Sequence, residues 1–468
     1  MRFTKCVRVL FAILPLVLLA SCGGSGSSST PPSGQTANVF TVATDAPLPS
    51  VVSCDITVTG VGLFNSDTNT LETVYTGSDP IDFAQLSGLH QLMQLNAVPT
   101  GNYTYAVVNI ANPVIGYINV PGGGAAPTVQ TVDGTLSMNS VQVNFATPFE
   151  LNNADLVGLR MDFDLRQSLA TDMNGNITGS VNPVFHMQLL NATDSQVSID
   201  DFLAGFVGLE NNGAFQVQGP HGRLWTVQTS NSTIFDDPDM SMNSYTTTTT
   251  LAISGQLDPV TMDIDASEVQ VVSTDGFYLG GLLTYVNPST GPATSADIYV
   301  RDELPSINGL VPGDIETLAL NGSEIYRIGN INLPLTTLLF NNSALAAGQR
   351  VGIGGAINTS SGTPQLTVHR VVLRRQGQAG TLAGNVTITN GNNGSFQLTD
   401  EWTAGILLPQ PLTVLTTNAT NFINLSGLSA LQGAPTTTDL RVVGFVLIDP
   451  QTGSPVLVAR SVEELTSD

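Results

Sequence analysis

The sequence has little charge, and most of the charge it has is negative. Charged residues occupy 11% of the 468 positions, against about 25% in an average globular protein. Lys and Arg total 14 against 37 Asp and Glu, which gives a net charge of −23. Such a chain cannot neutralise a run of phosphates or dock electrostatically on anionic lipid headgroups. General nucleic-acid binding is therefore excluded.

Residues that usually carry catalysis are also scarce. Lys5 is the one lysine, so a chain processed after its N-terminus has no residue for Schiff-base chemistry. We find no serine-hydrolase elbow, zinc-protease motif, Cys-x-x-Cys pair or phosphate-binding loop. The four histidines are spread over three predicted units, which disfavours a shared metal site or catalytic triad: they are His90, His186, His221 and His369. We expect no enzyme activity, no cofactor and no metal.

The N-terminus has the layout of an export signal. Within residues 1–21, three basic residues precede an apolar stretch of about a dozen residues, which is too short to span a bilayer. Cys22 follows Leu-Ala-Ser, and this pattern resembles a bacterial lipobox, which implies cleavage before Cys22 and lipidation of its thiol. An ordinary secretory signal with an incidental cysteine is the alternative. Loss of three positive charges would take the net charge from −23 to −26.

The segment after the predicted cleavage site reads as a tether. Residues 22–38 are rich in Gly and Ser, a composition typical of a flexible linker. Gly23 rather than Asp follows the cysteine, and in enteric-type sorting this pattern resembles export to the outer membrane. Cys54 is then the one cysteine left for the folded part, so no intramolecular disulfide is expected. We interpret Cys54 as a small buried strand residue rather than a reactive thiol.

Residues 39–195 show the alternation of short strands. One exception is 82–95, where leucines at three-residue spacing predict a short helix. Around 159–165 the apolar residues alternate with Arg160, Asp162 and Asp164, which should share one face. Paired carboxylates could serve glycoside hydrolysis, but a solvated strand face explains the same pattern.

Several motifs in this region resemble a known family. They are Thr44-Asp45-Ala46-Pro47, the strand ending in Gly60-Val61-Gly62-Leu63, the turn Pro99-Thr100-Gly101-Asn102 and the strand Asp162-Phe163-Asp164-Leu165. Together they resemble a domain of unknown function found at the N-terminus of bacterial lipoproteins. The resemblance covers about residues 39–190 and implies a transthyretin-like or prealbumin-like β-sandwich on the cell surface. It carries over no functional residue, since the family has no assigned activity.

The second half of the chain contains an internal repeat. Three blocks recur in the same order: 211–217 as 392–398, 226–235 as 413–422, and 253–259 as 442–450. A divergent copy fits between them. We predict OB-like repeats over 202–273, 274–376 and 380–466, each of about five strands with an Asn-Gly hairpin in the outer copies. This region resembles a second domain of unknown function, often repeated in exported proteins. The expected fold is all-β, an antiparallel sandwich followed by about three small barrels.

Few side chains stand out as ligand contacts. Trp225 and Trp402 are the two tryptophans, one in each outer repeat, and could stack on sugars if exposed; a core or rim position is the alternative. Asp172 to Asn176 and Asp236 to Asp239 are oxygen-rich loops that suit calcium, although the first lacks the distal Glu of a calcium loop and both also read as turns. A basic cluster, which could bridge to carboxylates, consists of Arg370, Arg374 and Arg375.

These observations predict a lipid-anchored protein of the cell envelope, facing the periplasm or the cell surface. Its role is expected to be structural or interactive rather than catalytic. The expected partners are the membrane, through the lipid, and an envelope protein or polysaccharide. The alternatives are a carbohydrate-binding lipoprotein that uses barrel-face aromatics, and a hydrolase that uses carboxylates such as Asp162.

Overall fold

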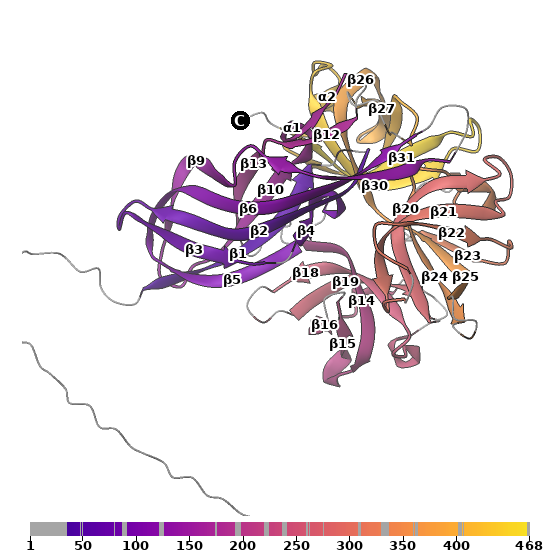
Figure 1. The fold of residues 1–468 in the computed structure, drawn as a ribbon, viewed down its shortest axis with the longest axis horizontal. Coiled ribbons are helices and arrows are strands. Elements are labelled where there is room, and N and C mark those ends of the chain that lie inside the picture. The colour runs from indigo at the N-terminus through magenta and orange to yellow at the C-terminus, as the bar shows by residue number, and fades with distance from the viewer. Residues whose placement is uncertain are drawn as a thin grey trace, which may run out of the picture.

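The computed structural model describes most of the chain after the predicted tether. The described residues are 35–46, 48, 50–78, 80–86, 91–120, 126–173, 176–191, 198–219, 224–235, 241–258, 261, 263–274, 276–307, 310–328, 337–358, 360, 364–400, 405 and 407–465. The signal segment, Cys22 and residues 23–34 lie outside them. Figure 1 shows a β-sandwich with a cluster of three further β-units packed at one end.

The sandwich is built from two main sheets. The first has the order β13-β10-β1-β5, with bounds β1 (Thr36–Ala46), β5 (Gln91–Pro99), β10 (Leu156–Asp164) and β13 (Phe185–Asn191). β1 and β10 run parallel, whereas the other two pairs are antiparallel. The expected sandwich is therefore present, but it is not wholly antiparallel, because a long excursion between β1 and β10 builds the second sheet before the chain returns.

The second sheet has the order β3-β2-β6-β7, with β4 on β2 and β9 on β6. Its strands are β2 (Val51–Asn65), β3 (Thr70–Thr76), β4 (Pro80–Asp82), β6 (Gly101–Asn119), β7 (Thr128–Asp133) and β9 (Ser140–Leu151). A small third sheet contains β8 (Thr135–Leu136), β11 (Leu169–Thr171) and β12 (Ile177–Val181), and the one-turn helix α1 (Leu165–Ser168) follows β10.

Alternation along the strands puts one apolar core between the two main sheets. Leu159, Met161 and Phe163 of β10 are fully buried and share this core with Cys54 and Ile56 of β2. Cys54 is 0% exposed and forms no disulfide, so its interpretation as a buried strand residue is confirmed. Because side chains alternate along β10, residues 160, 162 and 164 point away from this core.

The helix expected over 82–95 is wrong. Only a 3-10 turn, η1 (Phe83–Gln85), forms there, and the Asp82 side chain caps it by accepting a hydrogen bond from the Ala84 N–H at 3.1 Å. Residues 87–90 lie outside the described part of the chain, and β5 starts at Gln91. β5 pairs with β1, placing Leu95 opposite Phe40. This sheet pairing outweighs the weak helical spacing of the leucines.

The rest of the chain forms three repeats of six strands each. The first repeat contains β14 (Ser198–Leu209), β15 (Ala214–Gln218), β16 (Leu224–Gln228), β17 (Ile234–Phe235), β18 (Thr250–Leu257) and β19 (Asp263–Ser273). The second contains β20 (Phe277–Asn287), β21 (Ser295–Leu304), β22 (Ile315–Ala319), β23 (Ile325–Ile328), β24 (Arg350–Asn358) and β25 (Gln365–Leu373). The third contains β26 (Gln376–Asn390), β27 (Asn393–Thr399), β28 (Leu412–Thr416), β29 (Asn421–Ile423), β30 (Asp439–Ile448) and β31 (Pro455–Glu464).

All three repeats share one strand order. In each, the first strand lies between the second and the fifth, and the sixth strand follows the fifth and pairs in parallel with the short fourth. The first and third repeats close into barrels through parallel β16–β19 and β28–β31 pairs. No such closing pair joins the described strands of the second repeat. The fold is thus all-β, and the middle copy is the divergent one.

Details of the repeats differ from expectation. Each has six strands rather than five. The additional strand is the short fourth one, which is only two to four residues long. β14 begins at Ser198 and β26 at Gln376, four residues before the expected starts. The first hairpin turns through the 3-10 segment η4 (Asn211–Gly213), whereas the third turns at Gly391, with φ +58°, and leaves Gly394 inside β27. Short helical turns precede the fifth strands: η5 (Met242–Ser244), η6 (Asn342–Ala344) and α2 (Leu428–Leu431).

A glycine on the fifth strand marks the same β-bulge in every repeat. Register shifts fall at Gly255, Gly355 and Gly444. A Cβ at any of the three would collide with a backbone carbonyl oxygen of the sixth strand, so only glycine allows this approach. The repeat motif at 253–255 and 442–444 therefore has a backbone cause.

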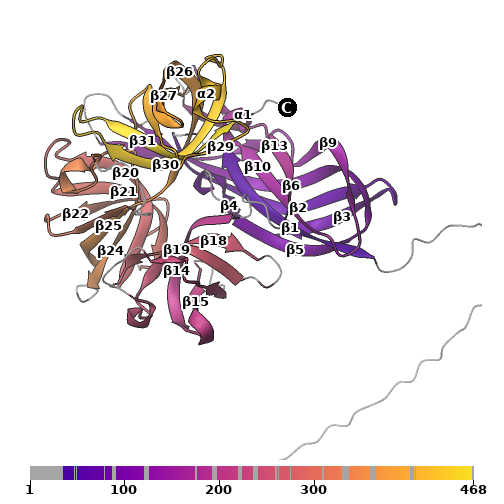
Figure 2. The same cartoon turned by 180° about the vertical axis from the view of Figure 1, so that it is seen from behind.

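Figures 1 and 2 show the sandwich and the three repeats lying against one another, and apolar side chains join neighbouring units. Tyr278 of the second repeat packs with Leu203 and Val272 of the first. Phe445 of the third repeat belongs to the second repeat's core. Tyr299 of the second repeat packs on Val52 of the sandwich. The repeats and the sandwich are therefore one packed body.

Candidate functional site

A cavity among the described residues lies where the sandwich meets the first and third repeats. It has a volume of about 680 Å³. Polar side chains dominate its lining, which consists of Thr44, Arg160, Gln228, Thr229, Ser230, Ser232, Gly255, Gln256, Asp265, Ala266, Ser267, Arg375, Asn421, Ile423, Arg441, Val443, Arg460, Ser461 and Glu463. We call this the central cavity.

The sandwich contributes to the central cavity through the outer face of its first sheet. In the parallel β1–β10 pair, Thr44 stands opposite Asp162, and in the β10–β13 pair His186 stands opposite the same residue. Arg160 lies one step back on that face of β10. The apolar partners on the other side are locked in the sandwich core, so the register of β10 determines which polar groups face the third repeat.

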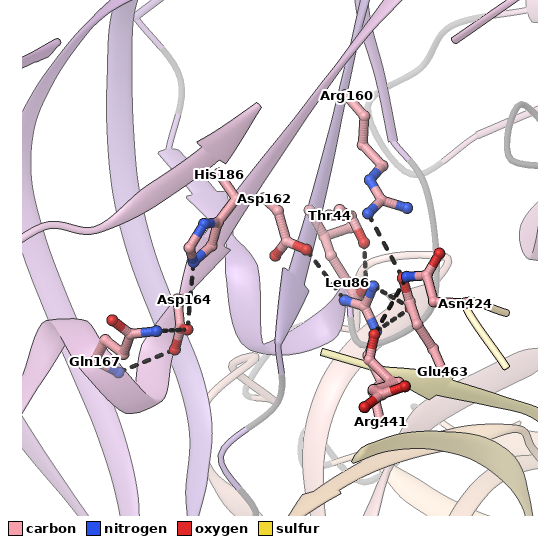
Figure 3. A network of polar contacts seen from close by, with 11 residues as sticks. Thr44, Leu86, Arg160, Asp162, Asp164, Gln167, His186, Asn424, Arg441 and Glu463 are labelled. Atoms are coloured by element: carbon pink, nitrogen blue, oxygen red, sulfur yellow. Dashed lines mark hydrogen bonds and ion pairs between the residues drawn. The ribbon is translucent and has the colours of Figure 1, made fainter. Parts of the chain in front are cut away.

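A buried network of four charges joins the sandwich to the third repeat (Figure 3). Arg441 of β30 contacts Asp162 at 3.2 Å and Glu463 of β31 at 2.5 Å. Arg160 contacts the other oxygen of Glu463 at 3.7 Å. Arg441, Asp162 and Glu463 are 4%, 6% and 7% exposed. Two cations and two carboxylates thus balance inside the interface, as burial of charge requires.

Asp164 serves the local structure beside this network. Its carboxylate accepts a hydrogen bond from the Gln167 backbone N–H at 2.9 Å and caps α1. His186 Nε2 lies 3.6 Å from the same carboxylate. Burial raises the pKa of Asp164, but the contacts from His186 and Gln167 outweigh it and leave the pKa below its ordinary value. Asp162 and Asp164 are both buried and therefore do not form a solvated strand face; Arg441 of the third repeat contacts Asp162, and Asp164 is bound by residues of the sandwich.

The predicted basic cluster joins the second repeat to the first. Arg375 contacts Glu268 at 3.3 Å, and Arg374, only 2% exposed, donates to the Gln270 side chain at 3.1 Å. Arg370 donates to the backbone carbonyl of residue 271 at 2.7 Å. The interpretation of this cluster as a bridge to neighbouring carboxylates holds for Arg375. All three arginines act across the repeat boundary.

The β-bulges place two side chains at the central cavity. Across from each bulge glycine, the sixth strand carries one extra residue that faces no partner position: Ser267 in the first repeat, His369 in the second and Arg460 in the third. Ser267 and Arg460 both line the cavity. A bulge re-aims a side chain relative to the regular pleat, so the repeat motif itself positions these two residues.

The structure separates the other predicted site residues. Trp225 is partly buried and packs edge-to-face on Phe202 at 5.4 Å, as part of the first repeat's core. It does not line the central cavity. Trp402, Cys22 and the Asp236–Asp239 loop lie outside the described residues, as do His90 and His221.

The loop from Asp172 is described only at its two ends, because residues 174 and 175 lie outside the described residues. Asp172 accepts hydrogen bonds from the backbone and side chain of Asn176 at 2.9 and 3.1 Å, as the turn alternative predicts. Across the described ranges, no group of three or more His, Cys, Asp or Glu side chains is placed to hold a metal ion. Within the same ranges, no helix is long and apolar enough to cross a membrane.

Sequence reasoning missed the residues that matter most here. Arg160 was noted only as a strand residue, and Arg441, Arg460 and Glu463 went unnoticed because they belong to no motif. A signal did exist: each lies in a strand that also carries several apolar residues, in a chain with few charges. A charge in such a strand needs a buried partner, although the sequence does not say which one.

Comparison with known proteins adds one family. No curated protein matches the chain. The N-terminal sandwich does match a family model: residues 36–178, which run from the start of β1 into β12, contain a domain described as Domain of unknown function (DUF4382).

Proposed function

We propose that this protein is a lipid-anchored, non-catalytic component of the bacterial cell envelope, held at the outer membrane by acyl chains on Cys22. The observation that supports the non-catalytic role is that the candidate carboxylate, Asp162, is already engaged in a structural contact. Asp162 is bound by Arg441 in a buried interface, and its neighbour Asp164 caps a helix. Neither carboxylate lines the central cavity, whereas a general acid or base must lie within hydrogen-bond reach of the substrate.

The same interface supports a structural or interactive role. Arginines connect the sandwich to the third repeat and the second repeat to the first, so buried ion pairs cross two of the unit boundaries. Rigid presentation of a surface lowers the entropic cost of binding a partner. An envelope protein or polysaccharide is the partner class we propose.

Lipid attachment is tested by metabolic labelling of the full-length chain. Cells fed an alkyne-bearing palmitate should yield a labelled protein in the outer-membrane fraction. Cys22→Ser should abolish the label, because the thiol is the acceptor, whereas the matched variant Cys54→Ser should keep it. Equal labelling of the Cys22→Ser chain would contradict the anchor.

Carbohydrate recognition is the second candidate function, and one observation favours it. The central cavity is lined by hydroxyl, amide and charged side chains, which suit the hydroxyl groups of a sugar. Trp225, in contrast, packs in the core of its repeat. We therefore place this candidate function at the cavity rather than at Trp225, and Trp402 lies outside the described residues.

A further inference from the structure

We propose that the central cavity binds an acidic saccharide, a sugar chain that bears carboxylate groups. This inference rests on the second candidate function and specifies its ligand. The cavity's volume of about 680 Å³ falls within the roughly 300–1,000 Å³ of small-molecule sites. It also lies where three units meet, and ligand sites favour such boundaries.

Charge is the first argument for an anionic ligand. Four arginines line the cavity, against the two carboxylates of Asp265 and Glu463. These six groups sum to +2, and Asp162 and Glu268, which contact Arg441 and Arg375 from outside the lining, bring the sum to zero, in a chain whose net charge is −23. Guanidinium groups recognise carboxylates through paired hydrogen bonds. A chain this poor in cations has concentrated them here.

Fixed geometry is the second argument. Asp162 and Glu463 hold Arg441, and Glu268 holds Arg375 from outside the lining. The bulge opposite Gly444 positions Arg460. Cations fixed before binding lose little side-chain entropy when a ligand arrives.

The neutral part of the lining is the third argument, and it specifies a sugar. Eight of the lining residues carry hydroxyls or amides on the two flanking repeats alone, and no aromatic side chain lines the described walls. Hydroxyls and amides donate and accept, and Asp265 and Glu463 can accept from sugar hydroxyls. Recognition here uses hydrogen bonds and charge rather than ring stacking. A single-stranded nucleic acid would need both stacking surfaces and an excess of positive charge along its length.

The test is calorimetric titration of the full-length chain in detergent with tri-galacturonic acid. Galactotriose, which lacks the carboxylates, is the matched ligand, and galacturonic acid and inorganic sulfate distinguish a chain from a free sugar acid or a simple anion. Arg460→Gln removes one cavity charge. Ser232→Trp obstructs the cavity from an exposed loop and changes no charge. Arg327→Gln, on β23 and outside the lining, is the matched charge control.

We expect one tri-galacturonate per chain, with no binding of galactotriose and much weaker binding of the monomer and of sulfate. Arg460→Gln should weaken affinity about tenfold or more, as loss of one charge-assisted hydrogen bond implies. Ser232→Trp should abolish binding, and Arg327→Gln should leave it unchanged. The proposal is overturned if tri-galacturonate fails to bind, if galactotriose or sulfate binds equally well, or if Arg327→Gln weakens binding as much as Arg460→Gln. Palmitate labelling at Cys22 measures lipid attachment separately, and its result does not depend on any of these binding outcomes.

Discussion

Replacing Arg441 with leucine should loosen the third repeat from the sandwich. The substitution removes the cation that contacts Asp162 at 3.2 Å and Glu463 at 2.5 Å, and all three residues are at least 93% buried. Removing one member of a buried ion pair costs about 3–5 kcal/mol, because the other charge stays in the interior. Glu463 keeps Arg160 at 3.7 Å, so we expect the lower value, about 3 kcal/mol.

Hydrogen exchange followed by mass spectrometry measures this loss where it occurs. A change of about 3 kcal/mol corresponds to roughly 100-fold faster exchange for amides of β10, β30 and β31 that open with the interface. Adding Asp162→Asn to Arg441→Leu should recover part of the protection, since it removes the stranded carboxylate, with a coupling of about 1–3 kcal/mol.

Arg166→Gln is the matched control for Arg441→Leu. Arg166 also crosses from the sandwich to the third repeat, but its partner Asp439 has a side chain that is 47% exposed. A pair of this kind contributes at most about 1 kcal/mol. Equal exchange in Arg441→Leu and Arg166→Gln, or no recovery by Asp162→Asn, would refute the reasoning.

Two further substitutions test other parts of the structure. Burial raises the pKa of Asp82 to about 7, against the lowering effect of Arg301 and with a raising effect from Asp55; the folded state therefore holds more protons than the unfolded state between about pH 4 and pH 7. The free energy of unfolding should fall as pH rises through that window. The expected fall is about 2 kcal/mol, because partial exposure of the side chain reduces the effect of the shift. Urea unfolding of Asp82→Asn should lack this pH dependence, and a parent-like pH profile would contradict the assignment. Gly444→Ala should destabilise the third repeat by about 1–3 kcal/mol, since its Cβ meets a carbonyl oxygen, whereas Gly433→Ala, with open space around it, should leave the urea midpoint unchanged; equal midpoints would contradict the bulge argument.

Local pattern predicted much of the fold. Strand alternation placed Cys54 in a core, and the recurrence of Gly255 as Gly444 identified the outer repeats. Both signals could be found because they depend on residues that are close together in the sequence. The helix over 82–95 failed since pairing with β1, some 50 residues away, decided the conformation of β5.

The central cavity was beyond sequence reasoning for the same physical cause. Arg441 and Asp162 are 279 positions apart in the chain, and no local pattern links them. Asp162 was read as solvated because its own strand has a polar face, and only the docking of β30 shows what covers that face. Charges in strands that also carry many apolar residues were the available signal, but they indicate that a partner exists without identifying it.

At each bulge the backbone requires a glycine on the fifth strand, whereas the extra residue on the sixth strand can vary. Each repeat keeps the glycine, while the residue opposite is Ser267, His369 or Arg460. Tandem copies of one unit can therefore diverge at that position without disturbing strand pairing. A single substitution at such a position, in evolution or by engineering, would change the chemistry of the cavity wall. Exchanging serine and arginine between the outer repeats would move a charge from one wall of the cavity to the other.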